Sequence, residues 1–260
     1  MNLLRAFRSF HGLGVDTNGK VQEAAAPPTE LVERLIRELP KLHAVSQDDA
    51  RWLTELGFPV EAGPVSWAVP PQVLRYFAEA VKPTDLTVET GAGQSTVALA
   101  ALAKHHTCIT IDRYCVDATL LYMEQIGIPR SKVTFVVESS DTALPKLAPP
   151  EKFDFAYIDG EHGYPFAALD WHFIDKHLKV GGIIGFDNVE VPSVHNHIEF
   201  LELNRTYRLV KNVSEPSLQC YGAYFYTKLV DQDRNSGSQL YNHRRVPGFF
   251  PQENSVWPWT

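Results

Sequence analysis

The chain has 260 residues, 44% of them hydrophobic, and a formal net charge of −7. This length supports one sizeable core with terminal additions, while the negative charge disfavours nucleic acid or an anionic membrane surface as a partner. No run approaches the roughly 20 apolar residues of a membrane helix, and the three cysteines form no even disulfide framework, which favours a reducing, cytoplasmic location.

The first third of the chain is predicted to be helical. Residues 14–28 are polar and end in Ala-Ala-Ala-Pro-Pro, so we expect a first segment at 1–28 made of a short helix and a linker. A helical segment should follow at 29–83, because apolar residues recur there at helical spacing. Its predicted helices cover residues 29–39, 47–56 and 72–81.

Strands and helices alternate from residue 86 onward. The first five strands are short and apolar, which is typical of a buried parallel sheet. The last two are joined by too few residues for a parallel crossover and should form an antiparallel hairpin. We therefore predict an α/β, Rossmann-like sheet of seven strands within a domain at residues 84–230. The predicted strands are 86–89, 108–112, 133–137, 153–158, 182–187, 207–213 and 221–228, with helices near 95–104, 117–127, 140–147, 165–178 and 195–203.

A glycine-rich turn follows the first of these strands. Residues 89–96 read Glu-Thr-Gly-Ala-Gly-Gln-Ser-Thr. The glycines allow a tight turn and a close approach of the backbone to a ligand, and the following helix aims free N–H groups at that ligand. A second acid, Asp112, ends the next predicted strand 23 residues after Glu89, about where a ribose-binding acid belongs.

Acidic residues also end the fourth and fifth predicted strands. Asp159 opens the segment Asp-Gly-Glu-His, which ends at His162, and Asp187 is followed by Asn188. Because the carboxyl ends of parallel strands meet at one edge of a sheet, Asp159, Asp187 and Asn188 should lie together there. Two carboxylates and an amide oxygen suit Mg²⁺ or a similar divalent ion, although Asp159 and Asp187 would also suit purely structural roles in their turns.

These segments resemble those of a known family. Residues 89–96 are similar to motif I of class I S-adenosylmethionine (SAM)-dependent methyltransferases. The pattern Asp-Gly-x-His-x-Tyr at 159–164, with Asp170 beyond it, resembles motif IV in one subgroup, and Asp159 with Asp187-Asn188 resembles the metal site of catechol- and caffeoyl-CoA-type O-methyltransferases. The resemblance covers residues 86–228 and implies O-methylation of a small molecule.

The resemblance also implies roles for individual residues. SAM would lie over the glycine-rich turn, with its ribose hydroxyls on the acceptor oxygens of Asp112 and its adenine near Ser139. A divalent metal, Mg²⁺ by expectation, would be held by Asp159, Asp187 and Asn188 and would lower the pKa of an acceptor hydroxyl. The complete set of expected cofactor residues is Glu89, Gly91, Gly93, Ser95, Thr96, Asp112, Ser139 and Asp159.

His162 has two interpretations. Its imidazole is suited to act as the general base near neutral pH, so His162 and Asp159 are the expected catalytic residues. Alternatively, His162 hydrogen-bonds its own turn or helps to hold the metal carboxylates. The helices before residue 84 and residues 67–71 are expected to form part of the acceptor pocket.

Other classes of function compete with a methyltransferase. An NAD(P)-dependent oxidoreductase has a similar sheet, but the turn lacks the third glycine of that pattern and the Asp-Gly-x-His segment argues against it. A metal-dependent hydroxylase-like relative and a binding protein without turnover are further alternatives. We expect a small-molecule acceptor, no nucleic acid, no membrane, and a homodimer or other homo-oligomer. The aromatic tail at 231–260 would pack on its own domain, on a partner subunit or over the active site.

Overall fold

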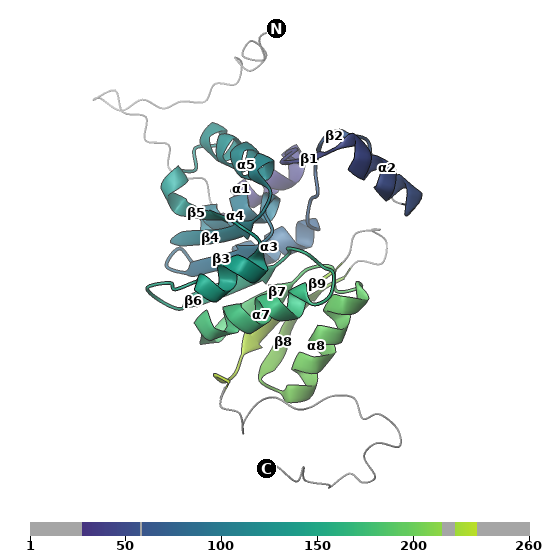
Figure 1. The fold of residues 1–260 in the computed structure, drawn as a ribbon. Coiled ribbons are helices and arrows are strands. Elements are labelled where there is room, and N and C mark those ends of the chain that lie inside the picture. The colour runs from purple at the N-terminus through teal and green to yellow at the C-terminus, as the bar shows by residue number, and fades with distance from the viewer. Residues whose placement is uncertain (1–27, 58, 215–221, 233–260) are drawn as a thin grey trace, which may run out of the picture.

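The computed structural model describes residues 28–57, 59–214 and 222–232. Its centre is a seven-stranded sheet with the strand order β5-β4-β3-β6-β7-β9-β8 (Figure 1). Strands β3 to β7 pair in parallel, and β9 pairs antiparallel with both β7 and β8, so the predicted sheet with its antiparallel hairpin is confirmed. The strands are β3 (Leu86–Thr90), β4 (His105–Thr110), β5 (Val133–Val137), β6 (Phe153–Ile158), β7 (Leu178–Phe186), β8 (Tyr207–Val213) and β9 (Ala223–Lys228).

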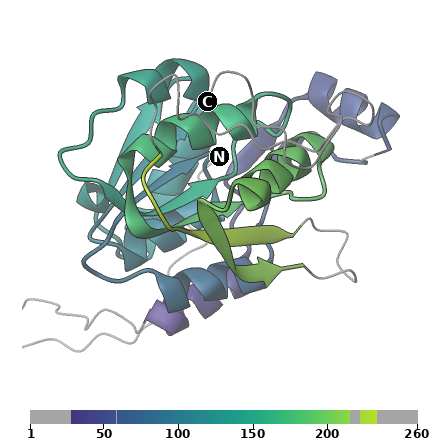
Figure 2. The same cartoon turned by 90° about the horizontal axis from the view of Figure 1, so that it is seen from below.

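Helices cover both faces of this sheet because its central strands are apolar on both sides. On β6, Phe155 and Tyr157 pack into one buried cluster with α1, α3, α4 and α5, while Ala156 and Ile158 pack into a second with α7 and α8. Figure 2 separates these layers, with α1 and α3 on one side and α8 on the other. The helices are α1 (Pro28–Glu38), α3 (Pro71–Ala80), α4 (Gln94–Leu102), α5 (Arg113–Gln125), α6 (Ser140–Ala143), α7 (Phe166–His177) and α8 (Pro192–Asn204), with the short helices η2 (Arg130–Lys132) and η3 (Leu144–Lys146).

The N-terminal segment contains a small hairpin that the sequence did not predict. Strand β1 (His43–Val45) pairs antiparallel with β2 (Gly63–Val65), and the predicted helix α2 (Gln47–Glu55) lies between them. Helix α2 projects from the body of the molecule (Figure 1). Both strands have only three residues, which is too short for a periodic hydrophobic pattern.

The predicted bounds of strands β4 and β7 are wrong. Strand β4 begins at His105 rather than at residue 108 and ends at Thr110, so Asp112 follows the strand and caps α5. His106 lies fully buried in β4. Its polar ring can be buried there because it hydrogen-bonds the Thr87 hydroxyl at 2.8 Å and Glu89 Oε1 at 3.0 Å. Strand β7 begins at Leu178 rather than at residue 182.

Some expectations concern residues outside the described part of the chain. These are the short helix and linker at 1–28, except Pro28, and the aromatic tail, except residues 231 and 232. None of the helices described is long and apolar enough to cross a membrane.

Candidate functional site

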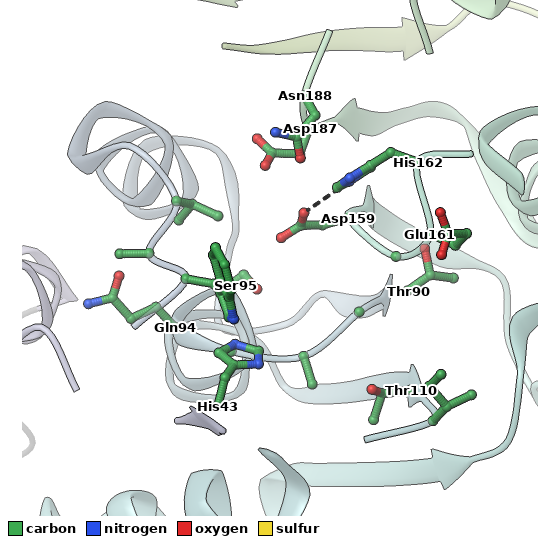
Figure 3. Close-up of a pocket in the computed structure, with 18 of the residues that line it drawn as sticks. His43, Thr90, Gln94, Ser95, Thr110, Asp159, Glu161, His162, Asp187 and Asn188 are labelled. Atoms are coloured by element: carbon green, nitrogen blue, oxygen red, sulfur yellow. Dashed lines mark ion pairs between the residues drawn. The ribbon is translucent and has the colours of Figure 1, made fainter. Parts of the chain in front are cut away.

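A large cleft lies at the carboxyl ends of the parallel strands. Its volume is about 1210 Å³, and residues that follow β3, β4, β5, β6 and β7 line it together with residues of the N-terminal segment (Figure 3). The connection from β3 leads to β4 on one side, while β6 pairs with β3 on the other side. Ligands of open α/β sheets bind at such a reversal of strand order.

The glycine-rich turn forms the floor of this cleft. Gly91 has a φ of +86°, in the left-handed region that favours glycine. A β-carbon on Gly91 would lie 2.0 Å from the carbonyl oxygen of Asp159, so only glycine fits between β3 and the end of β6. Gly93 then precedes the first residue of α4, and its N–H donates to Thr96 Oγ1 at 2.9 Å. Gly91, Gly93 and Ser95, which are predicted to bind the cofactor, line the cleft.

Two predicted cofactor residues lie behind the turn rather than on the wall of the cleft. Glu89 is fully buried, and its Oε1 accepts hydrogen bonds from the Thr96 hydroxyl and from His106. Glu89 Oε2 is buried and has no hydrogen-bond partner among the described residues. Glu89 and Thr96 therefore connect β3, β4 and α4 beneath the turn.

Asp112 stands at the entrance to α5. Its Oδ1 accepts the N–H of Cys115 at 3.0 Å and caps the helix, while its Oδ2 lies 3.8 Å from His43 Nδ1. The side chain is 38% exposed, and its neighbours Thr110 and Ile111 line the cleft. Asp112 itself lies beside the cleft wall. Ser139, predicted near the adenine, lines the cleft beyond β5.

Asp159 and Asp187 meet at the ends of β6 and β7. Burial, reinforced by the negative charge of Glu89, raises the pKa of Asp159 to about 8. Burial and then the charge of Asp159 raise the pKa of Asp187 well above its ordinary value, against a 2.8 Å hydrogen bond from the Tyr157 hydroxyl. Two such carboxyls retain a proton near neutral pH unless a cation lies between them.

His162 faces this pair of carboxyls. Its Nε2 lies 3.5 Å from Asp159 Oδ1 (Figure 3) and is buried without a hydrogen-bond partner among the described residues. The Ser193 hydroxyl donates to the His162 carbonyl and fixes the loop to α8. Burial lowers the pKa of His162, so the imidazole is neutral at neutral pH and can accept a proton. Asn188, which also lines the cleft, has a φ of +52°.

The structure adds cleft residues that sequence reasoning missed. His43 comes from β1, Val60 from the loop before β2, and Phe166 from the start of α7. Of residues 67–71, which are expected in the acceptor pocket, Trp67, Ala68, Val69 and Pro70 line the cleft, whereas no described residue of the helices before residue 84 does so. No pattern pointed to His43, because its place depends on how a hairpin some 50 residues before the turn packs against it.

The charges that line the cleft have one sign. Carboxylates line it at Glu138, Asp159, Glu161 and Asp187, whereas no lysine or arginine of residues 28–57, 59–214 and 222–232 does so. Apolar surface comes from the N-terminal segment, where Trp67 is 51% exposed. The cleft therefore suits a ligand with an apolar body and disfavours a dense array of phosphates.

One family model matches the central part of the chain. Residues 88–189 match the model of a family described as a methyltransferase domain. No curated protein sequence matches the chain. One similar solved structure is the O-methyltransferase TomG of Streptomyces achromogenes, which is involved in tomaymycin synthesis and was solved in complex with SAM. It is 20% identical to this chain with a TM-score of 0.56, and the match covers 70% of this chain and 87% of that one.

Proteins with other activities have the same fold. An rRNA methylase from Streptococcus thermophilus is 16% identical with a TM-score of 0.51, over 61% of this chain and 95% of that one. A precorrin 8w decarboxylase from Methanobacterium thermoautotrophicum is 18% identical with a TM-score of 0.50, over 73% and 99%. At these identities the likeness shows the fold, and the cleft has to distinguish among reactions.

Proposed function

We propose that this chain, whose residues 88–189 match a methyltransferase domain, is a class I SAM-dependent methyltransferase that O-methylates a small molecule with the help of a divalent metal ion. The observation that carries this proposal is the pair of carboxyls with raised pKa values, the partly exposed Asp159 and the buried Asp187, beside the neutral imidazole of His162. All three side chains line the cleft whose floor is the glycine-rich turn.

We place SAM over Gly91 and Gly93. Gly91, Gly93 and the first residues of α4 line this part of the cleft, and the N-terminus of a helix favours an anionic group such as the SAM carboxylate. The ribose hydroxyls would bind Asp112 Oδ2, since Oδ1 is already used in the helix cap. Glu89 and Thr96 would support the turn from behind, and Ser95 and Ser139 would line the two ends of the cofactor site.

The donor set at Asp159, Asp187 and Asn188 fits a divalent cation. The two carboxyls have raised pKa values and would repel each other if both were ionised, and no lysine or arginine of the described residues lines the cleft to neutralise them. A doubly charged ion would remove this repulsion and would find oxygen ligands of the kind Mg²⁺ prefers. Such an ion, when bound, supplies Lewis acidity that makes an acceptor hydroxyl more acidic.

His162 would take up the proton of the acceptor hydroxyl. Its ring is neutral, and its Nε2 makes no hydrogen bond among the described residues and is directed at the carboxyl pair (Figure 3). A base must lie within hydrogen-bond reach of the proton that it removes, and an acceptor oxygen beside both His162 Nε2 and the carboxyl of Asp159 would meet this condition. Asp159 would hold the protonated imidazole in place by its negative charge.

A small molecule is the acceptor class that the cleft favours. RNA recognition requires basic groups against phosphates, and the charged residues that line the cleft in the described structure are acidic. The apolar side chains of Trp67, Val69 and Phe166 would contact the body of the acceptor. The likeness to an rRNA methylase extends to the fold alone.

The test is release of S-adenosylhomocysteine (SAH) from SAM in the presence of aromatic acceptors with one hydroxyl or two neighbouring hydroxyls. We expect turnover with the dihydroxy compounds in Mg²⁺, its loss in EDTA, and its recovery on adding Mg²⁺ back. His162→Ala should lower kcat, while Asp117→Asn, on the exposed side of α5, should not. Full turnover in EDTA would refute the metal role, and methylation of RNA instead of any small acceptor would refute the acceptor class.

A further inference from the structure

One residue of the cleft comes from outside the part of the chain that matches the methyltransferase family. His43 lies in β1, whereas the family match begins at residue 88. Its side chain is only 18% exposed and lines the cleft at the glycine-rich turn (Figure 3). The N-terminal hairpin therefore touches the place where we put the cofactor.

The first contact of His43 is with Gly93. A β-carbon on Gly93 would lie 3.1 Å from His43 Nε2, which is closer than such atoms normally approach. The backbone of Gly93 is extended, with a φ of 168°, so strain does not require glycine at this position. The missing side chain instead gives the imidazole room to lie against the turn.

The second contact is with Asp112. His43 Nδ1 lies 3.8 Å from Asp112 Oδ2, the one carboxylate oxygen that the cap of α5 leaves available. This separation is longer than a hydrogen bond, and polar contacts in ligand-free sites commonly shorten when the ligand binds. Burial lowers the pKa of His43, so the ring is neutral at neutral pH and carries one N–H donor and one acceptor.

Cys115 completes the surroundings of this ring. Its Sγ lies 3.9 Å from His43 Nε2 and donates to the Ala92 carbonyl at 3.2 Å. Burial raises the pKa of the thiol to about 12, which suits its role as a hydrogen-bond donor. His43 thus faces Asp112 with Nδ1 and Cys115 with Nε2.

We propose that His43 is a positioning residue that holds the Asp112 carboxylate in place for the ribose hydroxyls of SAM, an inference that rests on the proposed function. The cofactor site is then completed by β1, and residues 88–189 alone lack part of it. His43 acts through Asp112, so its effect must depend on the ribose hydroxyls of the ligand. This dependence distinguishes positioning from a general contribution to folding.

The test is calorimetric titration of the full chain with two ligands, SAH and its 2′,3′-dideoxyribose analogue. We expect His43→Ala to weaken SAH on the order of tenfold, as the loss of one hydrogen-bonding group does, and to leave the affinity for the analogue unchanged. His43→Asn, whose amide N–H occupies about the place of Nδ1–H, should recover most of the SAH affinity. His105→Ala is the matched control. His105 lies on β4 away from the cleft, and its ring hydrogen-bonds the Ser131 carbonyl and the Thr134 hydroxyl.

Any other outcome contradicts either the proposed function or the positioning role of His43. If the unaltered chain binds no SAH, the proposed function fails. If it binds SAH and His43→Ala binds equally well, or loses both ligands alike, the positioning role fails while the proposed function stands. If His43→Ala does not fold, the SAH affinity of His43→Asn tests the positioning role. An affinity of His43→Asn as weak as that of Asp112→Ala overturns that role.

Discussion

The carbonyl oxygen of Asp159 lies 2.0 Å from the point that a β-carbon would occupy on Gly91. This relationship joins the two segments of the sequence that carry the chemistry, the glycine-rich turn after β3 and the Asp-Gly-Glu-His segment after β6. Parallel pairing of β3 with β6 brings them together, and the N–H of Asp159 donates to the Thr90 carbonyl at 3.0 Å. The turn is thus shaped by the strand that neighbours it in the sheet.

The first prediction concerns Gly91→Ala. Gly127 provides a control, because its φ of +81° is similar to the +86° of Gly91 while a β-carbon there would meet nothing within 4 Å. Gly127→Ala should lower the free energy of unfolding by about 1 kcal/mol through backbone strain alone. Gly91→Ala adds the collision with Asp159 and should cost at least about 2 kcal/mol more. Urea unfolding of both variants measures the difference, and equal losses would show that the turn is not constrained by Asp159.

The second prediction separates the two oxygens of Asp112. Asparagine caps helices as well as aspartate does, so Asp112→Asn should keep the stability of α5, while Asp112→Ala should lose about 1 kcal/mol. Both changes remove the negative charge offered to a ribose diol and should weaken SAH roughly tenfold to a hundredfold. Thermal melting and SAH titration test this together, with Asp117→Asn as the control for charge on α5. An SAH affinity unchanged in Asp112→Asn would remove Asp112 from the cofactor site.

The third prediction concerns the metal ligands. Asp187→Asn removes a carboxylate from the proposed ligand set and should weaken binding of Mn²⁺ at least on the order of tenfold, because oxygen sites for hard cations depend on ligand charge. Tyr157→Phe is the matched control, since it removes only the 2.8 Å hydrogen bond to Asp187 Oδ1 and keeps both carboxylates. Electron paramagnetic resonance of free Mn²⁺ gives both affinities. Equal binding by Asp187→Asn and the unaltered chain would show that the ion, if any, binds elsewhere.

The fourth prediction concerns acid stability. His197 packs among Trp171, Phe186 and Phe200, and burial lowers its pKa from 6.5 to about 3. Between those two pH values the unfolded chain binds one more proton than the folded chain, so stability falls as the pH falls. His197→Gln should reduce this slope by about 1.4 kcal/mol per pH unit.

The control for this slope is His195→Gln, on the same helix but exposed. Urea unfolding at pH 7, 6 and 5 measures the slopes. A slope in His197→Gln equal to that of the control would mean that His197 is not held neutral in the folded protein.

Much of the fold and part of the site could be predicted from the sequence. Asp159, Asp187 and Asn188 lie on one edge because parallel strands place their carboxyl ends there, and that rule needs no tertiary detail. Glu89 was expected at the cofactor, but side chains alternate along a strand and its side chain lies beneath α4 beside Thr96. The order of residues in the glycine-rich motif does not tell to which side of the strand the Glu89 side chain points.

One contribution of the N-terminal segment to the site could not be predicted. His43 reaches the cleft from β1, a strand of three residues, and its position depends on how the hairpin packs against the domain. Strand β4 begins at His105, earlier than the predicted residue 108, because His105 and His106 are polar and do not continue the apolar pattern. His106 is buried by its hydrogen bonds to Thr87 and Glu89, which bring together residues far apart in the sequence.

The central claim is that the cleft over Gly91 and Gly93 holds SAM rather than a nicotinamide dinucleotide. Calorimetric titration of the full chain with SAH and, separately, with NAD tests it most directly. The account predicts saturable binding of one SAH per chain, weakened roughly tenfold to a hundredfold in Asp112→Ala, and no saturable heat with NAD. Binding of NAD without binding of SAH would contradict it and would assign the cleft to an oxidoreductase.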